Sequence, residues 1–118
     1  MKKKKNKNLD ALIGQDTHIK GEIETSDSIR IDGSVDGNIT VQGYIVIGKG
    51  AKVKGDIKAE AATILGKVTG NIVAEKELQV SKESVIIGDI TTKNLIIESG
   101  AVFDGKCNMY DKNAKQKG

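Results

Sequence analysis

A three-residue unit, glycine followed by a polar residue and then isoleucine, recurs through most of this 118-residue chain. The copies begin at Gly21, Gly37, Gly55, Gly70, Gly88 and, in the degenerate form Gly-Lys-Cys, at Gly105. Successive copies are 16, 18, 15, 18 and 17 residues apart. This spacing is too short for a repeat made of two helices, and its regularity indicates a repeat architecture for the whole chain.

Aligning the segments on this unit places apolar residues in four columns. The first column contains Ile23, Ile39, Ile57, Ile72, Ile90 and Cys107; the second contains Ile29, Ile45, Ala62, Leu78 and Leu95. The third contains Ile31, Ile47, Ile64, Val80 and Ile97; the fourth contains Ile19, Val35, Val53, Val68, Ile86 and Phe103. Within a segment the apolar residues alternate with the period of a β-strand until a corner interrupts them. We therefore predict an all-β solenoid with three short strands per winding.

The predicted solenoid is a single domain. Each strand should pair in parallel with its equivalent one winding on, and about six windings at ~4.8 Å would form a rod roughly 25 to 30 Å long. Glycines such as Gly33 and Gly37 suit the corners because a positive φ costs glycine little. Aromatic residues are only 3% of the chain, so the core must be aliphatic. We expect a basic, flexible tail over 1–17, the β-helix core over 18–107 and a second flexible tail over 108–118.

Charge is distributed unevenly between these parts. Residues 9–107 contain 11 basic and 15 acidic side chains, a net charge of −4, whereas the two ends are basic. An acidic body argues against a nucleic-acid groove. The N-terminal segment is the candidate membrane attachment, through Met1, Lys2, Lys3, Lys4, Lys5 and Lys7. Each lysine near an anionic leaflet contributes ~1 kcal/mol, and a solubilising tail is the alternative interpretation.

Enzymatic chemistry has little support in the sequence. The only histidine, His18, precedes the first Gly-x-Ile unit, and the spacings do not hold the multiples of six that are typical of solenoid acyltransferases. No P-loop is present, and the single Cys107 excludes an intramolecular disulfide or a cysteine zinc site. The polar residue of each unit reads Glu, Asn, Asp, Asn, Asp, Lys along the stack, which we interpret as a solvated face rather than a metal site. We expect no enzyme activity and no cofactor.

The ends of a solenoid expose unpaired strand edges and an open core, so solenoids are capped or join end to end. Residues 108–118 show no amphipathic pattern that would make a C-terminal cap, whereas Leu9, Leu12 and Ile13 could partly cover the N-terminal end. We therefore place a candidate polymerisation interface at the two ends. Its residues are Phe103, Val102, Ile97 and Leu95 at the C-terminal end and Ile19 and Ile23 at the N-terminal end.

The Gly-x-Ile windings from Ile19 to Lys106, the proline-free aliphatic core and the short polar tails resemble the bactofilins, bacterial cytoskeletal proteins that polymerise without nucleotide. The resemblance implies a right-handed parallel β-helix and non-polar filaments formed through like ends. It implies membrane attachment through the N-terminal tail and roles in cell shape and in positioning cell-wall proteins. In the family an aromatic residue near the end of the core is associated with polymer contacts, and Phe103 occupies the matching location.

We expect a structural protein that is its own main partner. With no apolar run long enough to span a bilayer and no signal peptide, the expected location is cytoplasmic, on the inner face of the cytoplasmic membrane. Expected partners are an anionic membrane surface and cell-wall synthesis or remodelling proteins. The alternatives are a solenoid binding scaffold that does not polymerise and, more remotely, a solenoid acyltransferase.

Overall fold

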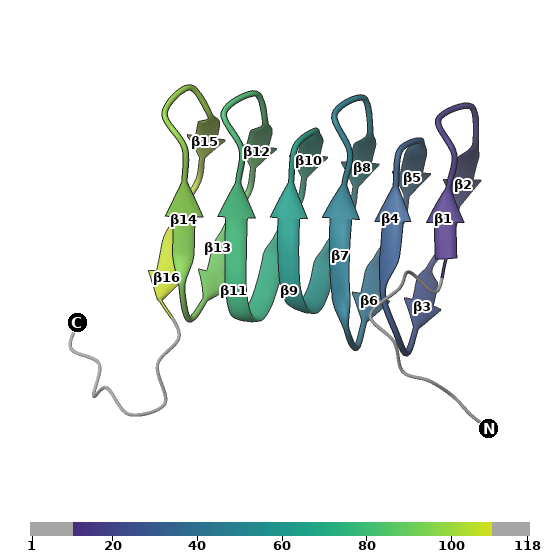
Figure 1. Cartoon of the computed structure of the whole chain (residues 1–118), viewed down its shortest axis with the longest axis horizontal. Helices are drawn as coiled ribbons and strands as arrows, with labels where there is room; N and C mark the ends of the chain where they lie inside the picture. Colours follow the sequence, from purple (N-terminus) through teal and green to yellow (C-terminus); the bar gives the residue numbers. More distant parts are fainter. Residues whose placement is uncertain (1–10, 110–118) are drawn as a thin grey trace.

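The computed structural model describes residues 11–109, and every regular element in this part of the chain is a β-strand. The strands are β1 (Ala11–Ile13), β2 (His18–Lys20), β3 (Ile23–Thr25), β4 (Ile29–Ile31), β5 (Ser34–Asp36), β6 (Ile39–Val41), β7 (Tyr44–Ile47), β8 (Lys52–Lys54), β9 (Ile57–Ile64), β10 (Lys67–Thr69), β11 (Ile72–Val80), β12 (Val85–Ile87), β13 (Ile90–Thr92), β14 (Leu95–Ile97), β15 (Val102–Asp104) and β16 (Cys107–Met109). They coil into the predicted parallel β-solenoid (Figure 1).

The solenoid has three faces, which we name after their first strands. The β1 face contains β1, β4, β7, the C-terminal halves of β9 and β11, and β14. The β2 face contains β2, β5, β8, β10, β12 and β15, one strand from each of six windings. The β3 face contains β3, β6, the N-terminal halves of β9 and β11, β13 and β16. In Figure 1 the chain rises along the β1 face, passes behind to the β2 face and advances leftwards, which makes the coil right-handed.

All four predicted columns are confirmed by the strand registers. In the first column, for example, Ile23 pairs with Ile39, and the ladder continues winding by winding to Cys107. The equivalent ladders on the other faces run from Ile29 to Leu95, from Ile31 to Ile97 and from Ile19 to Phe103. In each of these columns, the residues between the first and the last winding are buried. Stacked branched aliphatic side chains therefore form the core.

A fifth inward column was not predicted from the sequence. Its members are Thr25, Val41, Ala59, Ala74, Thr92 and Met109. Ala59 and Ala74 are buried where β9 and β11 continue round a corner without a break. Alanine and threonine do not distinguish the inside of a strand from its surface, so alternation alone misses this column.

The corner glycine of the repeat is required by close backbone approach. Gly55 has a φ of 148°, and a Cβ atom placed there would lie 2.1 Å from the carbonyl oxygen of Gly37 in the preceding winding. Gly37, Gly70 and Gly88 have the same relation to the glycine one winding before them. Any side chain at these positions would collide with main chain, which explains why glycine recurs once per winding.

The first winding begins earlier than the sequence suggested. Strand β1 pairs with β4, with Ala11 beside Ile29 and Ile13 beside Ile31. The expected boundary at residue 18 therefore falls inside the first winding, because no Gly-x-Ile unit precedes β1 to align it. Leu12 points outwards and is 60% exposed rather than covering the core. At the other end β16 extends to Met109. Leu9 lies outside the described residues, as do residues 1–10 of the tail expected over 1–17 and residues 110–118 of the tail expected over 108–118.

Candidate assembly surfaces at the two ends

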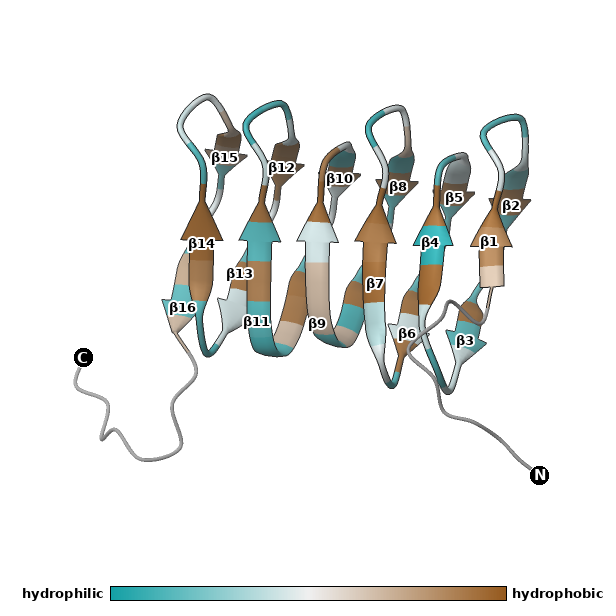
Figure 2. Cartoon of the chain, viewed as in Figure 1, coloured by the Kyte–Doolittle hydropathy of each residue, from teal (hydrophilic) through white to brown (hydrophobic). Residues whose placement is uncertain are grey.

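The C-terminal end of the described solenoid is formed by β14, β15 and β16, each of which pairs with a strand on one side only. Apolar side chains remain exposed there, with Ile97 at 42%, Val102 at 52% and Met109 at 56%. Figure 2 shows β14 as apolar along its whole length. This end combines an uncovered core with an unpaired strand edge, the two features that promote association with another chain.

The predicted C-terminal residues divide into two groups in the structure. Leu95, Ile97 and Phe103 belong to the inward columns and stack on Leu78, Val80 and Ile86 of the winding below. Phe103 and Leu95 are half-buried and pack against the core, so their free sides face along the solenoid axis. Val102 instead alternates outwards and continues the side of the β2 face beside Val85. The three inward residues form the end surface, whereas Val102 lies at its rim.

The N-terminal end presents smaller side chains. Ile19 pairs with Val35 and Ile23 pairs with Ile39, and both isoleucines are half-buried. The structure adds Ala11 and Ile13 of β1 to this end, which sequence reasoning did not include in the site. A signal for them was present: Ala-Leu-Ile-Gly at residues 11–14 is a run of three apolar residues followed by glycine, as is Ile-Val-Ile-Gly at residues 45–48.

The polar residues of the Gly-x-Ile units form a hydrogen-bond ladder along one corner. The backbone N–H of Asp56 donates to Asn38 Oδ1 at 2.9 Å, and that of Asn71 donates to Asp56 Oδ1 at 3.0 Å. The N–H groups of Asp89 and Lys106 donate in the same way to Asn71 and Asp89. Asparagine and aspartate therefore satisfy backbone donors of the next winding. The series ends at Lys106, whose side chain has no acceptor atom.

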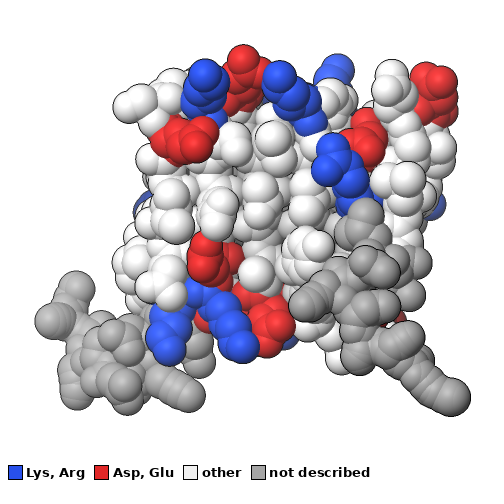
Figure 3. Space-filling view, in the orientation of Figure 1, with Lys and Arg blue, Asp and Glu red and all other residues white. Residues whose placement is uncertain are grey.

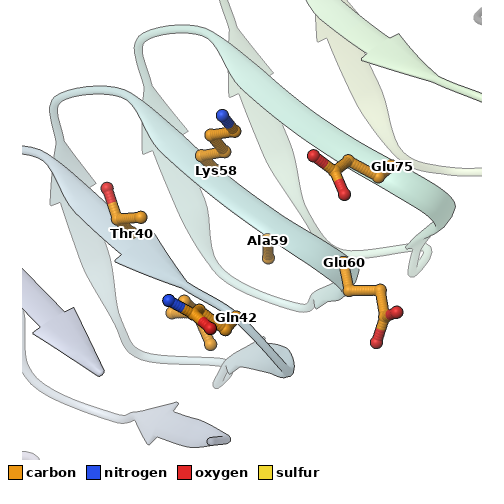
Figure 4. A pocket seen from close by; sticks show the side chains of 7 residues that line it. Thr40, Gln42, Lys58, Ala59, Glu60 and Glu75 are labelled. Carbon is orange, nitrogen blue, oxygen red and sulfur yellow. The ribbon is translucent and has the colours of Figure 1, made fainter. Parts of the chain in front are cut away.

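One surface hollow of the described solenoid contains charged side chains. A hollow of about 320 Å³ on the β3 face is lined by Thr40, Val41, Gln42, Lys58, Ala59, Glu60 and Glu75 (Figure 4). Glu60 is paired with Lys76 at 3.1 Å. Within residues 11–109 no three or more His, Cys, Asp and Glu side chains are grouped so that they could hold a metal ion. His18 is exposed on β2, apart from this hollow.

The predicted membrane attachment, from Met1 to Lys7, lies outside the described residues. In the described part of the chain, no helix is long and apolar enough to span a bilayer.

Comparisons with known proteins agree with this architecture. A family model described as "Bactofilin: Polymer-forming cytoskeletal" matches residues 11–108. A cryo-EM reconstruction of Thermus thermophilus bactofilin double helical filaments is 32% identical, with a TM-score of 0.81, and the match covers 85% of this chain and 99% of that one.

Two further solved structures are similar. A solid-state NMR structure of the cytoskeletal bactofilin BacA is 33% identical over 86% of this chain and 97% of its own, with a TM-score of 0.76. A crystal structure of a Thermus thermophilus bactofilin point mutant is 29% identical over 77% of this chain and 100% of its own, with a TM-score of 0.72. No curated protein matches the chain.

Proposed function

Because this chain belongs to the bactofilin family of polymer-forming cytoskeletal proteins, we propose that it assembles without nucleotide into non-polar filaments whose solenoids join end to end through like ends. The observation that carries this proposal is the open C-terminal winding. Its inward residues Leu95, Ile97 and Phe103 pack on one side against the core and on the other side face outwards. A second copy placed on this end would remove their exposed apolar surface from water.

A head-to-tail stack is the alternative arrangement, and one feature favours it. The Gly-x-Ile corner begins with Glu22 at the N-terminal end and finishes with Lys106 at the C-terminal end. Stacking unlike ends would bring these opposite charges together, whereas stacking like ends would not. Such an exposed ion pair is worth at most about 1 kcal/mol, which is less than the burial of two or three aliphatic side chains. The pair alone therefore does not set the orientation.

We include paired strands in the proposed filament, since the filaments of the similar Thermus thermophilus protein are double helical. The proposed biological role is a scaffold that holds cell-shape or cell-wall proteins on the inner face of the cytoplasmic membrane. Such a role needs no catalytic site. A solenoid that binds partners without polymerising is the competing function.

Negative-stain electron microscopy of the purified full chain, without nucleotide or metal, tests the self-assembly proposal. We expect long unbranched filaments whose abundance rises with protein concentration. Adding a nucleotide should change neither their length nor their number. Uniform short rods at every concentration would contradict self-assembly and support the binding scaffold.

The membrane proposal concerns the lysines at positions 2–7 and has a separate test. Filaments of the full chain should co-sediment with vesicles that contain anionic phospholipid and not with neutral vesicles. Deleting residues 2–8 should abolish this binding, because the described body contains more acidic than basic residues. Replacing the five lysines with serine is the matched control that keeps the length of the tail. Unchanged binding in either variant would contradict the proposed attachment.

A further inference from the structure

The outward side chains of the β1 face form an almost uncharged column along the solenoid. In register from the first winding to the last they are Leu12, Arg30, Val46, Thr63, Gln79 and Ile96. The only charged member is Arg30, whose Nε lies 3.1 Å from a carboxylate oxygen of Asp32. Beside the column, Glu77 also lies on the β1 face, where its Oε2 accepts a hydrogen bond from Gln79 Nε2 at 2.7 Å. Figure 3 shows this face with a largely uncharged area at its centre, interrupted towards the right by neighbouring charges of opposite sign, and with both signs of charge along its upper and lower margins.

The β2 face is different. Its outward positions include Lys20, Lys52, Lys54 and Lys67, together with Asp36 and Asp104. Three of these four lysines lie in the third and fourth windings, where Lys52 and Lys67 are beside each other on paired strands. Neighbouring like charges repel, so this face is suited to water or to an anionic partner. The β1 face carries no comparable repulsion.

We propose that the β1 face is the lateral surface through which two filaments of this protein pair. The inference rests on the proposed function, because only an end-to-end filament makes the face continuous. Ile96 on this face adjoins Ile97 of the C-terminal end, so the side contact and the end contact meet at one edge. The occupant is a second copy of the same face.

The charges of the β1 face favour a second copy over a lipid surface. An anionic membrane requires unpaired cations, and the one cation within this column is held by Asp32. Along the margins, Lys49 pairs with Glu83 and Lys76 pairs with Glu60. A face with balanced margins and a neutral centre meets a copy of itself without net repulsion, and a two-fold contact between identical surfaces is the commonest symmetry of protein assemblies.

The size of the face predicts when pairing occurs. Six strands at ~4.8 Å and three residues at ~3.3 Å give a surface of roughly 29 by 10 Å, or about 300 Å² per copy. Stable contacts between soluble proteins bury about 800 Å² per partner. Single rods should therefore remain unpaired. In a filament the small contacts add along the polymer, and pairing becomes stable.

Two threonines of the fourth winding provide a matched test. Thr63 lies on the β1 face and Thr69 on the β2 face, and both point outwards. We expect Thr63→Glu filaments of the full chain to be single-stranded, with half the mass per length of wild-type filaments by scanning transmission electron microscopy. Thr69→Glu filaments should keep the wild-type mass per length. Val46→Lys, which adds the opposite charge to the β1 face, should also give single strands.

The outcomes separate this inference from the proposed function. Wild-type protein without filaments would contradict the function itself. Wild-type filaments that are single strands, or Thr63→Glu and Val46→Lys filaments that stay paired, would overturn the inference and leave the proposed end-to-end assembly intact. The inference would also be overturned if Thr69→Glu filaments were single-stranded to the same extent as Thr63→Glu filaments. If Thr63→Glu kept the pairing but lowered binding to anionic vesicles, while Thr69→Glu did not, the β1 face would instead be a lipid-facing surface.

Discussion

The two ends of the solenoid are built from the same columns of residues but differ in the size and exposure of their apolar side chains. Among the described residues, the exposed large apolar side chains include four from the last winding, Ile96, Ile97, Val102 and Met109. Of these, Ile97 and Met109 are inward residues of the open end, whereas Ile96 and Val102 point sideways. Only Leu12 comes from the first winding, and it also points sideways. The fourth column begins at the N-terminal end with Ile19 and finishes at the C-terminal end with Phe103.

Because the two ends differ, a filament made through like ends contains two unequal junctions. The C-terminal junction would bury larger apolar side chains than the N-terminal one, and buried apolar area stabilises association. We expect a dimer joined through the C-terminal ends to form first as concentration rises. Filaments then grow by the weaker N-terminal contact. A head-to-tail filament would contain one kind of junction and no such intermediate.

The largest predicted effect comes from placing a charge at either end of the fourth column. Phe103→Arg and Ile19→Arg should each abolish long filaments. Burying an unpaired guanidinium costs well over about 1.4 kcal/mol, which weakens the contact by more than about tenfold. The remaining junction differs between the variants: Ile19→Arg should stop at stable dimers, and Phe103→Arg should be largely monomeric. Sedimentation velocity measures both states.

Circular dichroism and thermal melting must show that both arginine variants keep the β-solenoid. Filaments of normal length and abundance from folded Phe103→Arg protein would contradict the assignment of this contact. If both variants are monomers under all conditions, one shared junction is being blocked, and the head-to-tail arrangement gains support.

A smaller effect is expected when the interior of a column is compared with its end. Ile64 is fully buried in the third column, whereas Ile97, the last residue of that column, is 42% exposed. Ile64→Ala should lower the free energy of unfolding by about 3 kcal/mol, within the usual cost of an aliphatic truncation in a core. Ile97→Ala should cost less than half as much. Denaturant unfolding in the Phe103→Arg background measures both without assembly, and equal costs would show that the C-terminal end is covered.

The smallest effect concerns the reactivity of Cys107 at the C-terminal end. Burial raises the pKa of this thiol above its ordinary value, so at pH 7 to 8 less of it is the reactive thiolate. Alkylation by iodoacetamide should be slower than for free cysteine and approach the same rate once the pH exceeds the raised pKa. Filaments should react more slowly still. A Ser34→Cys, Cys107→Ser variant, labelled on the side of the β2 face, should react equally in rods and filaments.

Much of the fold could be predicted because every winding needs the same residue types at its inward positions and at its glycine corner. Ile39, Ile57 and Ile72 recur at one inward position, and the glycine before each is forced by the main chain of the preceding winding. Each of these two constraints determines the type of one residue per winding, at a regular spacing. They predict the strands, their parallel pairing and the columns without reference to any loop.

Other features depend on several neighbours at once and were not predictable. Ala11 and Ile13 lack a preceding Gly-x-Ile unit, so the start of the first winding was missed. Strand β9 runs without interruption from the β3 face to the β1 face, and the small side chain of Ala59 is buried along it. Small side chains also occur on surfaces, so the sequence did not reveal this continuous strand. Of the candidate site, Phe103 and Ile97 could be placed at an open end from the columns alone. The neutral side of the β1 face became visible only once the registers were known.

Cross-linking through Cys107, the only cysteine in the chain, tests the junction between like ends most directly. In a like-end filament each C-terminal junction contains two Cys107 residues, one from each copy. In a head-to-tail filament successive copies are separated by six windings of ~4.8 Å, so a bis-maleimide shorter than about 20 Å would not join them. We predict covalent dimers from assembled full-chain filaments and none from monomeric Phe103→Arg protein. If a monofunctional maleimide alkylates Cys107 in filaments but a bis-maleimide never cross-links it, the junction between like ends is contradicted.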